Sequence, residues 1–273
     1  MLEPKIYYYI VCHDPRLIDE CEKSVSGKLP GLQYVLVGRQ PYSSVLDREK
    51  MIVCNELSDN IEHLPNLCSF TAWYAIRKNR LPTDGYVCLL EYDSKVGTNF
   101  DSINKRLLSE QTNNRFMLGY LKAPVDHPVF LKSTPWLEIS LRQELNIDLA
   151  SLVACHKQKN PFWITTTNVT IPWSIFSDFV DWYLPLTKTF ARDPWGVFVQ
   201  ERALYVYSVL HHLEIKFSEV QILDHAESKS HGLVDLYGDF LKLRGSGVFN
   251  HEMESDYDVL YRYFIETMTH GSS

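Results

Sequence analysis

The chain has 273 residues, of which 45% are hydrophobic and 22% are charged, a composition typical of soluble globular proteins and not of disordered ones. Its 27 basic and 34 acidic residues give a formal net charge of −7, which argues against a nucleic-acid partner. No run of 18 apolar residues occurs, so no transmembrane segment is expected. The six cysteines include no C-x-x-C pair, and we expect reduced thiols in a cytoplasmic protein.

The first half of the chain alternates short apolar runs with helical patterns. The predicted elements are strands at 5–11, 34–37, 51–54 and 86–90, and helices at 17–25 and 67–78. Asn66 is the expected N-cap of the second helix. Continuous apolar strands separated by helices are typical of a mostly parallel sheet that is covered on both faces.

The second half mixes further strands and helices. The predicted elements are strands at 115–120, 162–166 and 220–223, helices capped by Thr134 and Ser174, and helices at 197–213 and 257–268. No internal repeat or linker divides the sequence. We therefore expect one α/β domain over residues 1–273, with the parallel sheet in 1–124 and the mixed elements in 125–273.

The most informative motif is Tyr86-Val-Cys-Leu-Leu90 followed directly by Glu91-Tyr92-Asp93. Ligands of open α/β sheets bind at the carboxyl ends of the strands. Side chains at positions i and i+2 of an extended segment point the same way, so Glu91 and Asp93 are expected to face one site. Two carboxylates there suit Mg²⁺ or Mn²⁺, which can in turn hold a diphosphate.

This motif resembles the Asp-x-Asp motif of the GT-A fold glycosyltransferases, in which such a strand leads to the acids that hold a divalent metal and the diphosphate of a nucleotide sugar. The order of elements is similar over most of the chain, and it also resembles that of small capsule-type and chlorella-virus-type transferases, such as a viral xylosyl- or rhamnosyltransferase. Glu91 departs from the pattern in the first position, while Asp93 keeps the second acid. The resemblance implies a single-domain, GT-A-type (Rossmann-like) fold with a nucleotide-sugar-binding half and an acceptor-side half.

The same resemblance implies the activity and the donor site. The protein would move a sugar from a nucleoside-diphosphate sugar, such as a UDP-sugar, to a glycan hydroxyl, with Mn²⁺ or Mg²⁺ as cofactor. Besides the acidic motif with Tyr92, the implied donor-binding residues are Val11, His13, Thr71 and Arg77. The guanidinium of Arg77 could grip a diphosphate, and a cation near a helix C-terminus is an equally good interpretation of it.

On the acceptor side, the segment Gln200-Glu201-Arg202 resembles the acidic pair that opens an acceptor-side helix in inverting GT-A enzymes. Glu201 takes the position of the catalytic base, with Asp193 as the alternative, and a carboxylate there could accept the proton of the attacking hydroxyl. Glu201 shares a predicted polar helix face with Tyr205, Ser208 and His212, which suits a sugar. A purely structural role at a helix start is the alternative.

The remaining candidates lie toward the C-terminus. His225 or His231 resembles the late histidine that completes the metal shell in many GT-A enzymes, and Lys229 could offset diphosphate charge. Trp195, between proline and glycine, is the best candidate for an aromatic platform under the acceptor. The sequon Asn168-Val169-Thr170 is interpreted as coincidental, because no secretory signal precedes it.

Two other classes of protein stay open at this point. A metal-dependent phosphoesterase could use Glu91, Asp93 and His225, although such enzymes usually carry a denser cluster of acids and histidines. A non-catalytic sugar-binding module would explain the six tryptophans but not a buried strand that ends in paired acids. The absence of a glycine-rich dinucleotide fingerprint or Walker motif argues against NAD and P-loop proteins.

Overall fold

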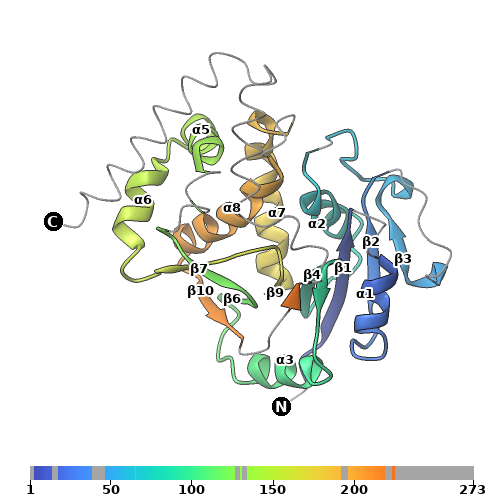
Figure 1. Ribbon diagram of the computed structural model, residues 1–273. Helices are drawn as coiled ribbons and strands as arrows, with labels where there is room; N and C mark the ends of the chain where they lie inside the picture. The colour runs from blue at the N-terminus through green and yellow to red at the C-terminus, as the bar shows by residue number, and fades with distance from the viewer. Residues whose placement is uncertain are drawn as a thin grey trace.

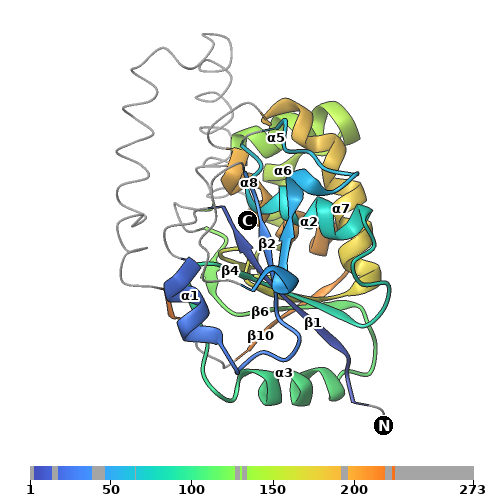
Figure 2. The ribbon, with the colours of Figure 1, turned by 90° about the vertical axis from the view of Figure 1, so that its right-hand side faces the viewer.

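A seven-stranded sheet separates two unequal layers of helices (Figures 1 and 2). The computed structural model describes residues 3–13, 18–38, 47–64, 66–126, 130, 134–191, 196–218 and 223–224. The strand order is β10 (Glu214–Phe217), β6 (Phe116–Gly119), β9 (Val169–Pro172), β4 (Tyr86–Glu91), β1 (Ile6–Cys12), β2 (Gln33–Leu36) and β3 (Met51–Val53). The expected mixed α/β fold, with a mostly parallel sheet flanked by helices, is confirmed.

One strand runs against the others in the middle of the sheet. Strands β4, β1, β2 and β3 are parallel to one another, and β10 is parallel to β6. β9 is antiparallel to both β4 and β6. Two small ribbons complete the structure: β5 (Ser94–Lys95) pairs with β11 (Leu223–Asp224), and β7 (Lys122–Pro124) pairs with β8 (Phe162–Ile164).

The two faces of the sheet explain why its strands are continuously apolar. In β1, Tyr8 and Ile10 pack on one face and Tyr9 and Val11 on the other, as the two-residue period of a strand requires. The first face is covered by α1 (Ile18–Val25) and α3 (Phe100–Ser109). The second is covered by α2 (Ser69–Lys78), α5 (Thr134–Leu145), α6 (Leu149–His156), α7 (Trp173–Leu186) and α8 (Gly196–Leu210).

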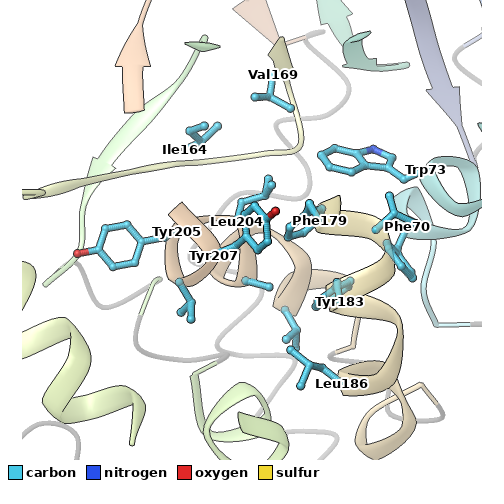
Figure 3. Close-up of a cluster of buried hydrophobic side chains, with 14 of the residues drawn as sticks. Phe70, Trp73, Ile164, Val169, Phe179, Tyr183, Leu186, Leu204, Tyr205 and Tyr207 are labelled. Atoms are coloured by element: carbon cyan, nitrogen blue, oxygen red, sulfur yellow. The ribbon is translucent and has the colours of Figure 1, made fainter. Parts of the chain in front are cut away.

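Aromatic side chains pack the helices of the second face against one another (Figure 3). Trp73 of α2 is fully buried, and its ring lies 5.6 Å from those of both Phe176 and Phe179 of α7. Tyr183 stacks on Phe179 at 5.5 Å and meets the edge of the Phe70 ring. Buried aromatic pairs of this kind stabilise a core by about 0.5–1.5 kcal/mol beyond their area burial. They fix α2 against α7 on the same face of the sheet as α8.

Several expected boundaries were wrong. The N-cap of α2 is Cys68 and not Asn66, and α7 begins at Trp173 after Pro172, without a side-chain cap from Ser174. The helix expected to reach residue 213 ends at Leu210, because the chain turns at 211–212. No expected element corresponds to α3, α6, β9 or β10, and the helix expected at 257–268 lies outside the described residues.

The structure describes short 3₁₀ turns at η2 (Arg48–Lys50), η3 (Cys54–Glu56) and η4 (Thr187–Thr189). No helix in the described part of the chain has both the length and the apolar character needed to cross a membrane.

Gly85 is required where the chain enters β4. Its φ is +70°, and a Cβ there would lie 2.5 Å from the carbonyl oxygen of Lys5, which accepts the N–H of Tyr86. Gly27 has a similar φ of +73° but no atom within 4 Å of a built Cβ. Gly27→Ala therefore isolates the backbone cost, which is about 1–2 kcal/mol for a left-handed residue.

We predict that Gly85→Ala lowers the free energy of unfolding by clearly more than Gly27→Ala, by about a further 1–3 kcal/mol for the overpacked contact. Urea denaturation of the two variants measures the difference. Equal losses would show that the start of β4 can move away from Lys5.

Candidate functional site

The acidic motif lies where β4 and β1 end side by side. Glu91 is the last residue of β4 and is in register with Val11 of β1. The N–H of Tyr92 donates to the carbonyl oxygen of Val11 (3.0 Å). The expected meeting of these two strand ends is thus present, and Asp93 follows one residue later at the carboxyl edge of the sheet, where α/β proteins bind ligands.

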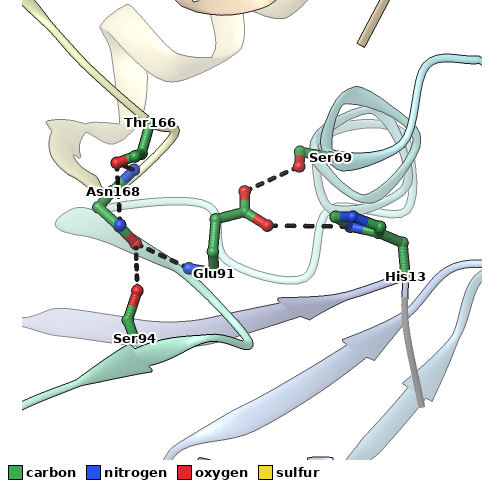
Figure 4. Close-up of polar contacts among 6 residues, drawn as sticks. All are labelled: His13, Ser69, Glu91, Ser94, Thr166 and Asn168. Carbon is green, nitrogen blue, oxygen red and sulfur yellow. Dashed lines mark hydrogen bonds and ion pairs between the residues drawn. The ribbon is translucent and has the colours of Figure 1, made fainter. Parts of the chain in front are cut away.

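The carboxylate of Glu91 is buried at this edge (Figure 4). The Oγ of Ser69, the first residue of α2, donates to Glu91 Oε1 (2.8 Å). The Nδ1 of His13 lies 3.9 Å from Glu91 Oε2. Among the described residues no donor hydrogen-bonds to Oε2, although this oxygen is buried. The carboxylate therefore keeps one acceptor oxygen that no described residue satisfies.

Three carboxylates influence one another in this region. Burial, together with the charges of Asp93 and Glu201, raises the pKa of Glu91 to about 8, while the Ser69 hydroxyl opposes the shift. Glu201 stands 110 residues after Glu91 in the sequence, so the fold brings the acceptor-side candidate within electrostatic reach of the acidic motif. Concentrated negative charge of this kind favours a cation.

Glu91 and Asp93 have the hard oxygen donors that Mg²⁺ and Mn²⁺ prefer, and the unsatisfied Oε2 of Glu91 fits such an ion. Within the described ranges, no three His, Cys, Asp or Glu side chains lie close enough together to enclose a metal ion. The expected third ligands, His225 and His231, lie outside the described residues, as do Lys229, Asp193 and Trp195.

His13 and Tyr92 form an aromatic border beside the acids. Their rings meet edge to face at a centroid distance of 4.8 Å. Tyr92 is buried, whereas His13 is exposed at the end of the strand. The side chain of Val11 is fully buried, so only its backbone could border a ligand.

The two candidates on α2 differ in position. Thr71 is buried near the N-terminal end of the helix, close to Ser69. Arg77 is eight residues beyond Ser69, which places it about 12 Å farther along the helix axis. Its Nη2 lies 2.8 Å from Asp181 Oδ2 on α7, and Lys78 shares that carboxylate. The structure therefore gives Arg77 a helix-pairing role and does not bring it to the acidic motif.

Glu201 lies on a buried helix beside an arginine. It is the sixth residue of α8, past the first turn, and its Oε2 lies 2.9 Å from Arg202 Nη1. Burial raises the pKa of Glu201, while Arg202 and a hydrogen bond from the backbone N–H of Thr166 hold it down. Arg202 and the Thr166 amide thus favour the ionised form of Glu201, whereas the helix dipole contributes little this far from the first turn.

Arg202 is buried with its charge satisfied. Its guanidinium lies 4.4 Å from the centroid of the Trp163 ring and donates to the carbonyl oxygens of Phe198 (2.8 Å) and Phe130 (3.4 Å). A buried cation without partners would be costly, so this set of contacts fixes the side chain next to Glu201. The sequence offered no signal for this arrangement beyond the Glu-Arg pair itself.

The polar helix face expected for the acceptor is not present. Tyr205 and Ser208 are each only 1% exposed, and the Tyr205 hydroxyl donates to the carbonyl oxygen of Asn160 (3.0 Å). His212 is exposed but follows the helix. The reason is that α8 packs against α5, α7 and β8 on several sides, so residues of both faces become core (Figure 1).

The N-terminal ends of α2 and α8 lie together. A Cβ at Gly196, the first residue of α8, would lie 2.6 Å from the carbonyl oxygen of Phe190 and 3.2 Å from that of Asn66. Asn66 stands three residues before α2. This close approach places the start of the helix that carries Glu201 beside the start of the helix that binds Glu91.

No protein-family model and no curated protein sequence matches this chain. The structure is similar to the apo structure of the bifunctional glycosyltransferase WbbM, with a TM-score of 0.50 and 15% sequence identity. The match covers 82% of this chain and 46% of the WbbM chain, so this chain corresponds to less than half of that protein. At this identity the likeness shows the fold: the chain has the α/β fold of a glycosyltransferase structure.

The raised pKa of Glu91 predicts a pH-dependent stability. Between its ordinary value of 4.5 and about 8, the folded protein holds a proton that the unfolded chain releases, so the contribution of Glu91 to stability falls as the pH rises through this window. Each unit of pKa shift corresponds to about 1.4 kcal/mol.

We therefore predict that Glu91→Gln, which can still accept from Ser69, is near neutral at pH 5 and stabilising relative to wild type at pH 8.5. Urea denaturation at both pH values tests this, with Glu110→Gln on the exposed end of α3 as the matched control. The free energies of unfolding of wild type and Glu91→Gln should therefore differ by different amounts at the two pH values. An equal difference at both would contradict the raised pKa of Glu91.

Proposed function

We propose that the protein is a metal-dependent glycosyltransferase that moves a sugar from a nucleoside-diphosphate sugar, such as a UDP-sugar, to a glycan hydroxyl with inversion of configuration. The observation that carries the proposal is the acidic motif Glu91-Tyr92-Asp93 at the carboxyl edge of the sheet, with the start of the helix that carries Glu201 beside the start of the helix that binds Glu91. The fold similarity to WbbM supports the same class. The capsule-type or viral subgroup and a cytoplasmic location are parts of the proposal that rest on the sequence alone.

The carboxylates on β4 would form the donor side of the site. Asp93, partly exposed beyond the strand end, would bind Mn²⁺ or Mg²⁺ together with the free oxygen of Glu91. When bound, such an ion neutralises the diphosphate and makes it a better leaving group. The exposed ring of His13 and the buried Tyr92 would border the nucleoside.

Glu201 would be the general base. Its carboxylate is partly buried, and Arg202 and the Thr166 amide favour the ionised form that a base needs at neutral pH. The acceptor oxygen would lose its proton to Glu201 as it forms a bond to the anomeric carbon, and the bond from that carbon to the diphosphate oxygen would break. A single displacement of this kind inverts the configuration.

Incubation with a panel of nucleotide sugars and Mn²⁺ tests the class of function. A transferase releases a nucleoside diphosphate and forms a glycan product, whereas a phosphoesterase releases phosphate and a sugar-binding module releases nothing. Release of phosphate alone, or of nothing across the panel, would contradict the proposal.

Removal of the metal-binding carboxylate should abolish metal-dependent donor binding. We expect Asp93→Ala to bind UDP equally with Mn²⁺ and with EDTA, because too few oxygen ligands remain to hold the ion. No ion then opposes the diphosphate charge in a protein of net charge −7. Asp84→Ala is the matched control, since Asp84 is an exposed carboxylate paired with Lys5 just before the opposite end of the same strand. Isothermal titration measures both, and Mn²⁺-enhanced UDP binding that survives in Asp93→Ala would argue against the site.

Loss of the base should slow turnover without weakening donor binding. Glu201→Gln keeps the size of the side chain and removes its basicity, so kcat should fall by about 10²- to 10⁴-fold while the donor affinity stays nearly unchanged. Glu138→Gln, a buried glutamate paired with Arg142 on α5, controls for loss of a buried charge. A Glu201→Gln protein with wild-type kcat, or a product that retains its configuration, would rule out this role.

A further inference from the structure

At the end of β4, beyond its last backbone pair with β9, a side chain supplies the hydrogen-bond acceptor. The pairing of β4 with β9 runs from Tyr86 opposite Pro172 to Leu89 opposite Val169, so the N–H of Glu91 lies beyond the last pair. Asn168 Oδ1 accepts this N–H at 2.7 Å. A buried backbone donor must find an acceptor, and here the amide of Asn168 replaces the missing strand residue.

The same oxygen also holds the other flank of the acidic motif (Figure 4). Ser94 Oγ donates to Asn168 Oδ1 (3.1 Å). Asn168 thus binds the residue at the start of the motif and the residue just after it, which encloses Tyr92 and Asp93 in a short loop tied at both ends. Asn168 is only 1% exposed.

The other half of the Asn168 amide points to a strained residue. Asn168 Nδ2 donates to Thr166 Oγ1 (2.9 Å), and the backbone N–H of Asn168 donates to the same oxygen (3.3 Å). Thr166 has a φ of +65°, which is rare for a β-branched residue and persists only when neighbouring contacts enforce it. The two bonds from Asn168 supply that constraint.

Thr166 in turn contacts the acceptor side. The influence of its backbone N–H holds the pKa of Glu201 down. A path of hydrogen bonds therefore runs from Glu91 and Ser94 through the Asn168 amide to the Thr166 hydroxyl, and the backbone amide of Thr166 faces Glu201. The path passes through one loop, residues 165–168, between β8 and β9.

We propose that Asn168 is a positioning residue that sets the acidic motif and Glu201 at a fixed spacing, through the left-handed conformation of Thr166. This inference rests on the proposed function for its consequence in catalysis, but the link itself is a property of the fold. It also explains why the sequon at Asn168 is no glycosylation site in the folded protein: the amide nitrogen is buried and already donates to Thr166.

The test uses an isosteric pair at Thr166. Thr166→Val removes the hydroxyl that Asn168 binds and keeps the side-chain shape, whereas Thr166→Ser keeps the hydroxyl. We expect Thr166→Val to lower kcat by about 10- to 100-fold, as for a small misplacement of a catalytic group, with the KM for the donor unchanged. Thr166→Ser should keep kcat near that of wild type. A Thr166→Val enzyme with wild-type kcat, or a loss shared equally by Thr166→Ser, would overturn the link.

Two further measurements do not require enzymatic activity, so they test the inference even if the proposed function is wrong. In Asn168→Ala, hydrogen exchange of the Glu91 amide should accelerate at least about tenfold, while the amide of Leu89 stays protected within the ladder. Unchanged exchange at Glu91 would overturn the role of Asn168.

The second measurement is a double-mutant cycle of Asn168→Ala and Glu201→Gln by urea denaturation. Because the two residues share partners through Thr166, their effects should be non-additive, whereas independent sites add. Additivity would overturn the link to Glu201. Should Asn168→Ala not fold, Thr166→Val takes its place in the cycle, since it leaves the Oδ1 contacts of Asn168 intact. If no sugar transfer is found with wild type, the proposed function fails, and these two measurements still decide the inference.

Discussion

The structure depends on the burial of one carboxylate at the end of a central strand. Glu91 is the last residue of β4, with Asp93 and Glu201 near enough to raise its pKa. Desolvation of a charge among like charges is unfavourable, and the protein offsets only part of it, through Ser69. A cost of this kind is typical of sites that bind or react, because such sites trade stability for function.

The antiparallel strand β9 brings residues from the second half of the chain to the acidic motif. Since β9 runs against β4, the loop that enters it lies at the same edge as the acids. A parallel strand in that place would have brought its other end to this edge. The loop carries Asn168 and Thr166 to the acidic motif. The same loop therefore borders both the acidic motif and Glu201.

Helix α8 shows how tertiary packing overrides an amphipathic pattern. Its spacing of apolar residues indicated one buried face, yet Tyr205 and Ser208 on the other face are buried as well. Burial on both faces makes α8 a rigid support, and the buried Arg202 holds the partly buried Glu201 in an ion pair at a fixed place. Rigid elements hold catalytic groups more accurately than loops.

The sequence alone determined most of the parallel strands, most of the helices and the position of Glu91 and Asp93 at a strand end, because these follow from local periodicity and the residues that interrupt it. It did not determine the antiparallel insertion of β9, the pairing of Arg77 with Asp181, or the link from Asn168 to the acidic motif. Those contacts join residues about 75 to 105 positions apart, and their energies depend on burial and on distances between groups that no local pattern encodes. Tertiary structure decided them by bringing a loop, a strand end and a helix to one edge of the sheet.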